Sequence, residues 1–249
     1  MMRDRKKHVA HVAFVVVVSI FGLVISTALL RNPIPFSAGA DGRRILVALA
    51  YDLVCIVGIL AVLFPLACSG VLGVRVSSAE SPEKFRISAT RFLGVLVVHG
   101  HHPLESESAK HELLFRERSF CATCYGLLTG AAVSLTTVTG FAVSGWPGWI
   151  GNYPAYLLYC VGVAAVITGL AQTLMPDAGA KARFVLAFVL VTGTGLMLLA
   201  TDLLTANLMA DLFVAVLAVF WLLSRISLSH RDWALICSRV TLRKTDLST

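Results

Sequence analysis

Long runs of apolar residues alternate with short polar segments along most of the chain. Each run is close to the roughly 20 residues that an α-helix needs to cross the hydrocarbon core of a bilayer. The runs do not alternate strictly between apolar and polar positions, as the strands of a transmembrane β-barrel do. The pattern therefore predicts an all-α integral membrane protein, a bundle of about six transmembrane helices. The predicted helices cover residues 9–30, 45–67, 123–144, 156–174, 184–203 and 210–224.

Composition supports a membrane protein. The chain has 249 residues, of which 57% are hydrophobic and only 14% are charged, and its mean hydropathy is +0.81. A soluble globular domain has about 25% charged residues. No internal repeat or low-complexity linker divides the sequence, so we expect a single polytopic membrane domain over residues 1–249, with one sizeable loop at 68–122.

Lysine and arginine gather on one side of this predicted topology. With a cytoplasmic N-terminus, the inner segments hold 18 of the 21 Lys and Arg residues, and the outer loops hold Arg31, Arg43 and Arg44. This bias follows the positive-inside rule and predicts a multi-pass protein of the cell membrane with both termini and the 68–122 loop in the cytoplasm. The net charge of +7 then reflects contact with membrane lipids, whose anionic headgroups lie at the inner face, rather than binding to nucleic acid. Association into a homo-oligomer is left open.

The loop at 68–122 contains a predicted amphipathic helix. Its apolar residues recur at helical spacing, and the run from Phe92 to Val98 is too short to cross a bilayer. We therefore expect a helix that lies at the inner membrane interface. The apolar positions are Phe85, Ala89, Phe92, Leu93, Leu96 and Val97.

Two cysteines three positions apart, Cys121 and Cys124, stand at the start of the third predicted crossing. This spacing allows two thiolates to bind one tetrahedral Zn²⁺, and nearby imidazoles can complete the ligand set. His101, His102 and His111 lie upstream in the same loop, and the sequence does not distinguish which of them bind. The motif predicts a zinc site at the cytoplasmic interface, in which Zn²⁺ attaches the loop to the third helix.

Two other interpretations of the cysteines stay open. The positive end of the following helix, together with Arg116 and Arg118, would favour a reactive dithiol. Alternatively, both cysteines are small buried apolar residues without chemistry of their own. Whether the protein is an enzyme is equally open, since an open zinc site could activate water and a dithiol could exchange disulfides.

Further polar residues are placed by the predicted topology. Gln172 and Arg183 flank an inner loop on the side of the two cysteines, so a shared cofactor-binding site is plausible there. Asp52 lies inside the second crossing, where a carboxylate marks a site, as in a transporter, makes a structural hydrogen bond to a neighbouring Ser, Thr or backbone carbonyl, or is simply protonated. Asp202 and Asp211 bracket a short outer turn, and we expect both to reach the outer headgroups.

The same motif carries a resemblance to a known family. The histidine pair followed by "RSFCATCYGLLTG" resembles the membrane proteins grouped as domain of unknown function 2085 (DUF2085). "TGLAQTL" at Thr168–Leu174 and the following "KARFVLAFVLVTGTG" resemble later segments of that family. This chain has Thr123 where the family shows arginine and Thr168 where it shows aspartate. The resemblance implies a small polytopic membrane protein with a Cys/His site, and it implies no particular activity.

Overall fold

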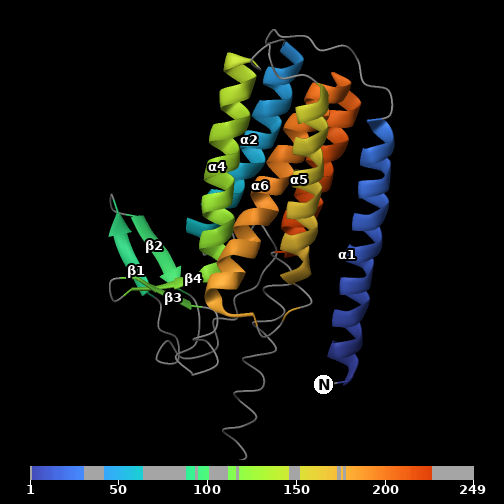
Figure 1. Ribbon diagram of the computed structural model, residues 1–249. Helices are drawn as coiled ribbons and strands as arrows, with labels where there is room; N and C mark the ends of the chain where they lie inside the picture. Colours follow the sequence, from blue (N-terminus) through green and yellow to red (C-terminus); the bar gives the residue numbers. More distant parts are fainter. Residues whose placement is uncertain are drawn as a thin grey trace, which may run out of the picture.

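The described part of the protein contains six helices and two β-hairpins. The structure is a computed structural model, and it describes residues 2–30, 42–63, 88–92, 95–100, 112–115, 118–145, 152–172, 175 and 178–225. Figure 1 shows the helices side by side in one bundle, with α1 at its edge. The last helix of the described residues, Leu208–Arg225, is named the C-terminal helix. The helices are α1 (Met2–Leu29), α2 (Gly42–Leu63), α4 (Ala122–Ser144), α5 (Asn152–Ala171), α6 (Ala180–Thr205) and the C-terminal helix (Leu208–Arg225).

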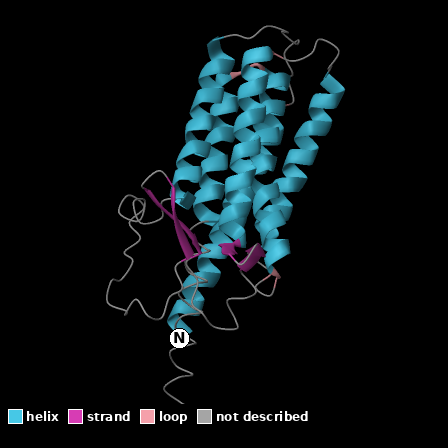
Figure 2. Cartoon of the chain, turned by 90° about the vertical axis from the view of Figure 1, so that its left-hand side faces the viewer, coloured by secondary structure: helices cyan, strands magenta, loops and turns pink. Residues whose placement is uncertain are grey.

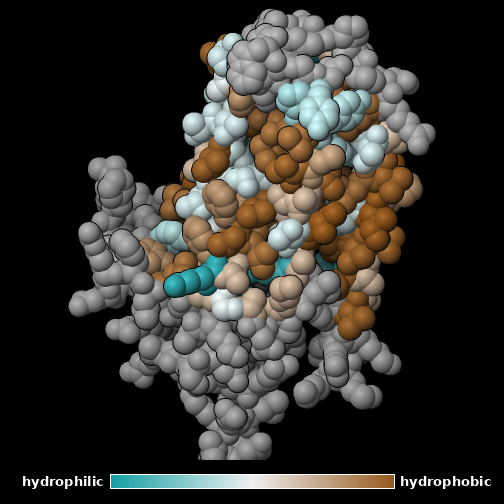
Figure 3. Space-filling view, viewed as in Figure 1, coloured by the Kyte–Doolittle hydropathy of each residue, from teal (hydrophilic) through white to brown (hydrophobic). Residues whose placement is uncertain are grey.

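The helices identify a polytopic membrane protein. Five of the six described helices contain a stretch of 18 to 26 residues that is long and apolar enough to cross a membrane. These are α1 from Val9 onward, α4, α5, α6 and the C-terminal helix. Figure 3 shows hydrophobic side chains over much of the helical surface in view, as expected for helices that face lipid. A helix is present at each of the six predicted positions, and α2 has 22 residues.

Two short β-hairpins precede α4 (Figures 1 and 2). The strands β1 (Ser88–Phe92) and β2 (Val95–Gly100) pair antiparallel, with Phe92 opposite Val95. The strands β3 (Glu112–Phe115) and β4 (Arg118–Cys121) form the second hairpin. The prediction of an amphipathic helix in this region is therefore wrong over Ser88–Phe92 and Val95–Gly100. Valine and phenylalanine favour strands, and the run of 95–98 has three valines, so its strand propensity outweighs the helical spacing.

Successive helices run in opposite directions, so residues far apart in sequence meet at the same end of the bundle (Figure 1). The hairpins and the starts of α4 and α6 lie at one end, which we call the hairpin end. The ends of α5 and of the C-terminal helix arrive there as well. The start of α2 and the turn between α6 and the C-terminal helix lie at the opposite end.

α6 is the central helix of the bundle, because it packs against both α4 and α5. Most of its second half is buried, from Leu190 to Thr205. Glycines on its neighbours allow backbones to come close, as is common between membrane helices. At Gly169 of α5, an added Cβ would lie 2.5 Å from Leu190 Cβ and 2.8 Å from Leu186 O of α6. No side chain larger than hydrogen fits this position without movement of α6.

Hydrogen bonds between buried side chains join the helices. The Tyr51 hydroxyl of α2 lies 2.8 Å from Thr194 Oγ1 of α6. At the edge of the bundle, two serines attach α1. Ser26 Oγ lies 2.6 Å from Tyr159 OH of α5. Ser19 Oγ accepts a hydrogen bond from Trp221 Nε1 of the C-terminal helix at 2.9 Å. Since lipid offers no hydrogen-bonding partner, these bonds fix which helix faces meet.

The close contact between α5 and α6 leads to a first prediction. Gly169→Ala should lower the free energy of unfolding by about 1–3 kcal/mol, because the new methyl group overlaps Leu190 and a backbone oxygen. Gly58→Ala in α2 is the matched control, since a Cβ there meets nothing within 4 Å. The control should be neutral or slightly stabilising, as alanine favours a helix. Thermal unfolding in detergent, followed by circular dichroism, measures both, and equal melting temperatures would contradict the packing of α5 on α6.

Candidate functional site at the hairpin end

The CxxC motif spans the junction between β4 and α4. Cys121 is the last residue of β4, pairs with Glu112 of β3, and has extended backbone angles as the N-cap of α4. Cys124 is the third residue of the helix. An N-cap side chain and the side chain three positions later lie on the same side of a helix start, and the two thiols are in hydrogen-bonding contact. The fold therefore brings two sulfur ligands together at a helix N-terminus, where the helix dipole favours negative charge.

An aromatic contact holds the strand and the helix in this arrangement. The rings of Phe120 in β4 and Tyr125 in α4 meet edge to face, with their centroids 4.8 Å apart. The geometry is one that aromatic pairs prefer. These two residues flank the cysteines, so their contact fixes the angle at which the hairpin enters the helix.

A buried polar chain lies beside the cysteines. Gln172, just after α5, donates from Nε2 to Thr123 Oγ1 of α4 at 3.4 Å, a long hydrogen bond. Its Oε1 accepts a hydrogen bond from Arg225 Nε, at the end of the C-terminal helix, at 3.2 Å. Arg225 is only 2% exposed, and its guanidinium interacts electrostatically with the Cys124 thiol. Three helices thus contribute polar groups to one buried cluster, called the Arg225 cluster: Thr123, Cys124, Gln172 and Arg225.

The structure places the predicted Cys121, Cys124, Gln172 and Arg183 at the same end of the bundle. Cys124 and Gln172 belong to the Arg225 cluster, and Cys121 contacts it through Cys124. Arg183 is buried in the first turn of α6, where its Nε donates to Ala178 O at 2.8 Å. That contact is with the segment preceding its own helix. A direct role of Arg183 beside the cysteines therefore stays a prediction.

The predicted histidine ligands, His101, His102 and His111, lie outside the described residues. Within the described ranges, no group of three or more His, Cys, Asp or Glu side chains could hold a metal ion. Two of the predicted ligands, Cys121 and Cys124, are described, and their thiols are adjacent.

Sequence reasoning missed Arg225 and Thr123. Arg225 follows the last apolar run, and such a residue looks like one more basic residue of a cytoplasmic tail. The predicted topology could have indicated Arg225, because the sixth crossing starts at the opposite end of the bundle and must end where the third crossing begins. A charged residue within the last turn of that crossing is then close to the CxxC motif.

The opposite end of the bundle contains a buried network of charges. Arg43 of α2 pairs with both Asp211 and Asp202, the latter at 2.6 Å between Nη2 and Oδ1. Arg44 Nε donates to Asp202 Oδ2 at 2.9 Å. Asp202 is buried and Asp211 is 0% exposed. The prediction that both aspartates reach the headgroups is therefore wrong, because the two arginines of α2 compensate their charge inside the protein.

A tight turn explains how the two aspartates meet one arginine. Ala206 adopts a left-handed conformation, with φ 46°, at the end of α6, and its N–H donates to Asp202 O. Asn207 then starts the C-terminal helix, since its side-chain oxygen accepts the Met209 N–H at 2.8 Å. The two helices turn back within two residues, which places Asp202 and Asp211 on neighbouring helices at the same level.

Comparison with known proteins finds no matching family model, no matching curated protein and no matching solved structure. The resemblance to the DUF2085 family stays a prediction from the sequence motifs.

The charge network gives a second prediction. Arg43→Met should destabilise the protein by about 3–5 kcal/mol, because it removes the arginine that pairs with the buried Asp211. Asp211→Leu should cost less, because Arg43 keeps its ion pair with Asp202. The double variant should cost about 1–3 kcal/mol less than the sum of the two, since both charges are then removed. Unfolding in detergent measures all three variants. Lys181→Met, at an exposed position of α6, is the control and should change stability little. Additive effects of the two substitutions would contradict the pairing.

Proposed function

We propose that this polytopic membrane protein carries a zinc site at the cytoplasmic membrane interface, which attaches the 68–122 loop to the helix bundle. The adjacent thiols of Cys121 and Cys124 at the start of α4 support this proposal most strongly. Cysteines at this spacing are typical of structural zinc sites. Arg225 places a positive charge beside Cys124, which would offset the negative charge of metal-bound thiolates.

The backbone of the hairpins supports histidine as the source of the remaining ligands. Glu112 is the strand partner of Cys121, and paired residues have Cα atoms about 5 Å apart. His111 is covalently bonded to Glu112, which keeps its Cα within about 4 Å of that of Glu112. His101 follows the last residue of β2, a strand that contacts β4. These connections make His111 our first choice of a third ligand, with His101 or His102 as the fourth.

The orientation is part of the proposal. We infer that α2 is a sixth crossing, because it runs beside α4 along the bundle (Figure 1). With six crossings, the first, third and fifth inter-helix connections lie opposite the hairpin end. Both termini and the second and fourth connections then lie on the side of the hairpin end, and these segments hold 18 of the 21 Lys and Arg residues. The positive-inside rule then assigns the hairpin end to the cytoplasm. Anionic lipid headgroups are the partners expected there.

Metal analysis tests the zinc site. Detergent-purified protein should contain about one Zn²⁺ per chain, which a Cys121→Ser, Cys124→Ser double variant should lose. A chelator should lower the melting temperature of the wild type and leave that of the double variant unchanged, because the bound metal contributes folding free energy. Cys160→Ser, at an exposed position of α5, is the matched control and should keep its zinc. Wild-type protein that is free of metal and insensitive to chelator would refute the proposal.

A redox-active dithiol is the second candidate, favoured by the proximity of Arg225 to Cys124. In this case one cysteine thiolate attacks a small disulfide such as oxidised glutathione and releases one thiolate. The other cysteine then attacks the mixed disulfide, loses its proton and releases the second thiolate, which leaves a Cys121–Cys124 disulfide.

Thiol exchange has its own test. If the dithiol is redox active, metal-free wild type titrated with oxidised glutathione should form the Cys121–Cys124 disulfide and release two equivalents of reduced glutathione, detected by mass spectrometry after alkylation. Arg225→Met should slow the reaction about tenfold or more by removing a positive charge beside the thiol, and Arg225→Lys should restore much of the rate. Cysteines that stay reduced in a disulfide-rich buffer would exclude this function and would leave the zinc site unaffected.

A further inference from the structure

Asp52 is a buried carboxyl group at the middle of α2. Its side chain is 8% exposed, and Thr139 Oγ1 of α4 donates to Oδ2 at 2.5 Å. Oδ1 has no hydrogen-bonding partner among the described residues. A carboxylate at membrane depth is costly unless a positive charge or several donors compensate it. One hydroxyl group is weak compensation for a buried carboxylate.

The neighbours of Asp52 leave this charge unbalanced. Across the interface, α4 contributes the uncharged Thr139, and on α2 itself the titratable neighbours are the adjacent Tyr51 and the Cys55 thiol, which interacts electrostatically with Asp52. Among the described residues of α2 and α6 near Asp52, the charged side chains are those of the ion-pair network at the opposite end of the bundle, formed by Arg43, Arg44, Asp202 and Asp211. Arg44 of that network is eight residues from Asp52, about 12 Å along the helix, and is already paired with Asp202.

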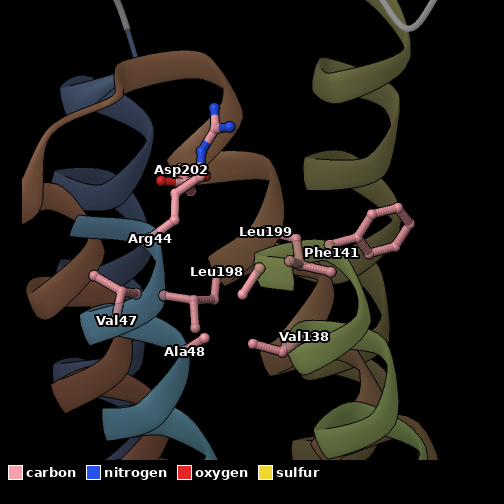
Figure 4. A pocket seen from close by; sticks show the side chains of 9 residues that line it. Arg44, Val47, Ala48, Val138, Phe141, Leu198, Leu199 and Asp202 are labelled. Carbon is pink, nitrogen blue, oxygen red and sulfur yellow. Dashed lines mark hydrogen bonds and ion pairs between the residues drawn. The ribbon is translucent and has the colours of Figure 1, made fainter. Parts of the chain in front are cut away.

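A small cavity extends from the ion-pair network toward Asp52. Arg44 and Asp202 line one end of it, and Ala48 and Val138 line the other (Figure 4). Its volume of about 20 Å³ is enough for one water molecule. Ala48 is one helical turn before Asp52, and Val138 is adjacent in sequence to Thr139. A water molecule in this cavity would therefore be one turn away from the carboxyl group.

We propose that Asp52 and Thr139 form a proton-binding site at the buried interface of α2 and α4, an inference that rests on α2 being the sixth crossing proposed above. When the site releases its proton, the carboxyl group gives it to a water molecule, which leaves a carboxylate and a hydronium ion. Thr139 then donates its hydrogen bond to the carboxylate and stabilises it. The site is separate from the zinc site, because it lies between other helix faces and uses none of its residues.

A proton fits this site better than a metal cation does. Hard metal cations take about six or more oxygen ligands. The described residues supply one carboxylate and one hydroxyl group at this position, whereas a proton needs only the unpartnered oxygen of Asp52.

Carbodiimide labelling tests this proposal on the wild-type protein. Dicyclohexylcarbodiimide is an apolar reagent that modifies protonated carboxyl groups in membranes. We expect mass spectrometry to find the label on Asp52 and to show its loss as the pH is raised. Asp202, which forms ion pairs with Arg43 and Arg44, is the internal comparison for a carboxyl group that is paired with positive charge. Absence of label on Asp52 at every pH, or labelling that does not change with pH, would overturn the proposal.

Two variants distinguish the role of Asp52 from that of Thr139. Asp52→Asn should lose the label at this position completely while the protein keeps its zinc content. Thr139→Val should retain the label up to a higher pH, by on the order of one pH unit, because the carboxylate loses its hydrogen bond. A Thr139→Val protein that melts as the wild type does and is labelled with the same pH dependence would remove Thr139 from the site. If a variant does not fold, the wild-type protein provides the same evidence through the infrared band of the protonated carboxyl group, followed against pH.

Discussion

Polar groups within a membrane must find their partners inside the protein, and this requirement determines how the helices pack. Arg43 and Arg44 join α2 to α6 and to the C-terminal helix because neither they nor Asp202 and Asp211 can stay unpaired when buried. At the hairpin end, Arg225 is held in the same way by Gln172. Between these two ends, hydroxyl groups satisfy backbone carbonyls and each other. The apolar residues keep the helices in the membrane, and the polar residues determine which faces meet.

The two ends of the bundle use buried arginine differently. At the ion-pair end, positive and negative charges balance, so the network has a mainly structural role. At the hairpin end, Arg225 donates to the Gln172 amide and interacts with the Cys124 thiol. A buried positive charge therefore lies beside a pair of adjacent thiols, and this is the reason for placing the candidate site there.

The helices could be predicted from the sequence because an apolar run of about 20 residues has few alternatives. The hairpin of β1 and β2 could not, because Phe92 and the valines of 95–98 fit a helical spacing and a strand composition equally well. The CxxC motif was visible from spacing, and its position at a helix start followed from the apolar run behind it. Arg225 and the partners of Asp202 were not accessible in this way. They depend on contacts between helices that are 50 to 160 residues apart, which a local pattern does not encode.

The attachment of α1 constrains how the protein assembles during synthesis. The polar partners of α1 are Tyr159 and Trp221, which follow Ser26 and Ser19 by 133 and 202 residues. These two contacts can form only after α5 and the C-terminal helix have been synthesised. The exposed apolar side chains of α1, such as Phe14 and Phe21, allow the helix to stay in lipid until then. The association of α1 with the bundle is therefore coupled to the synthesis of segments far along the chain.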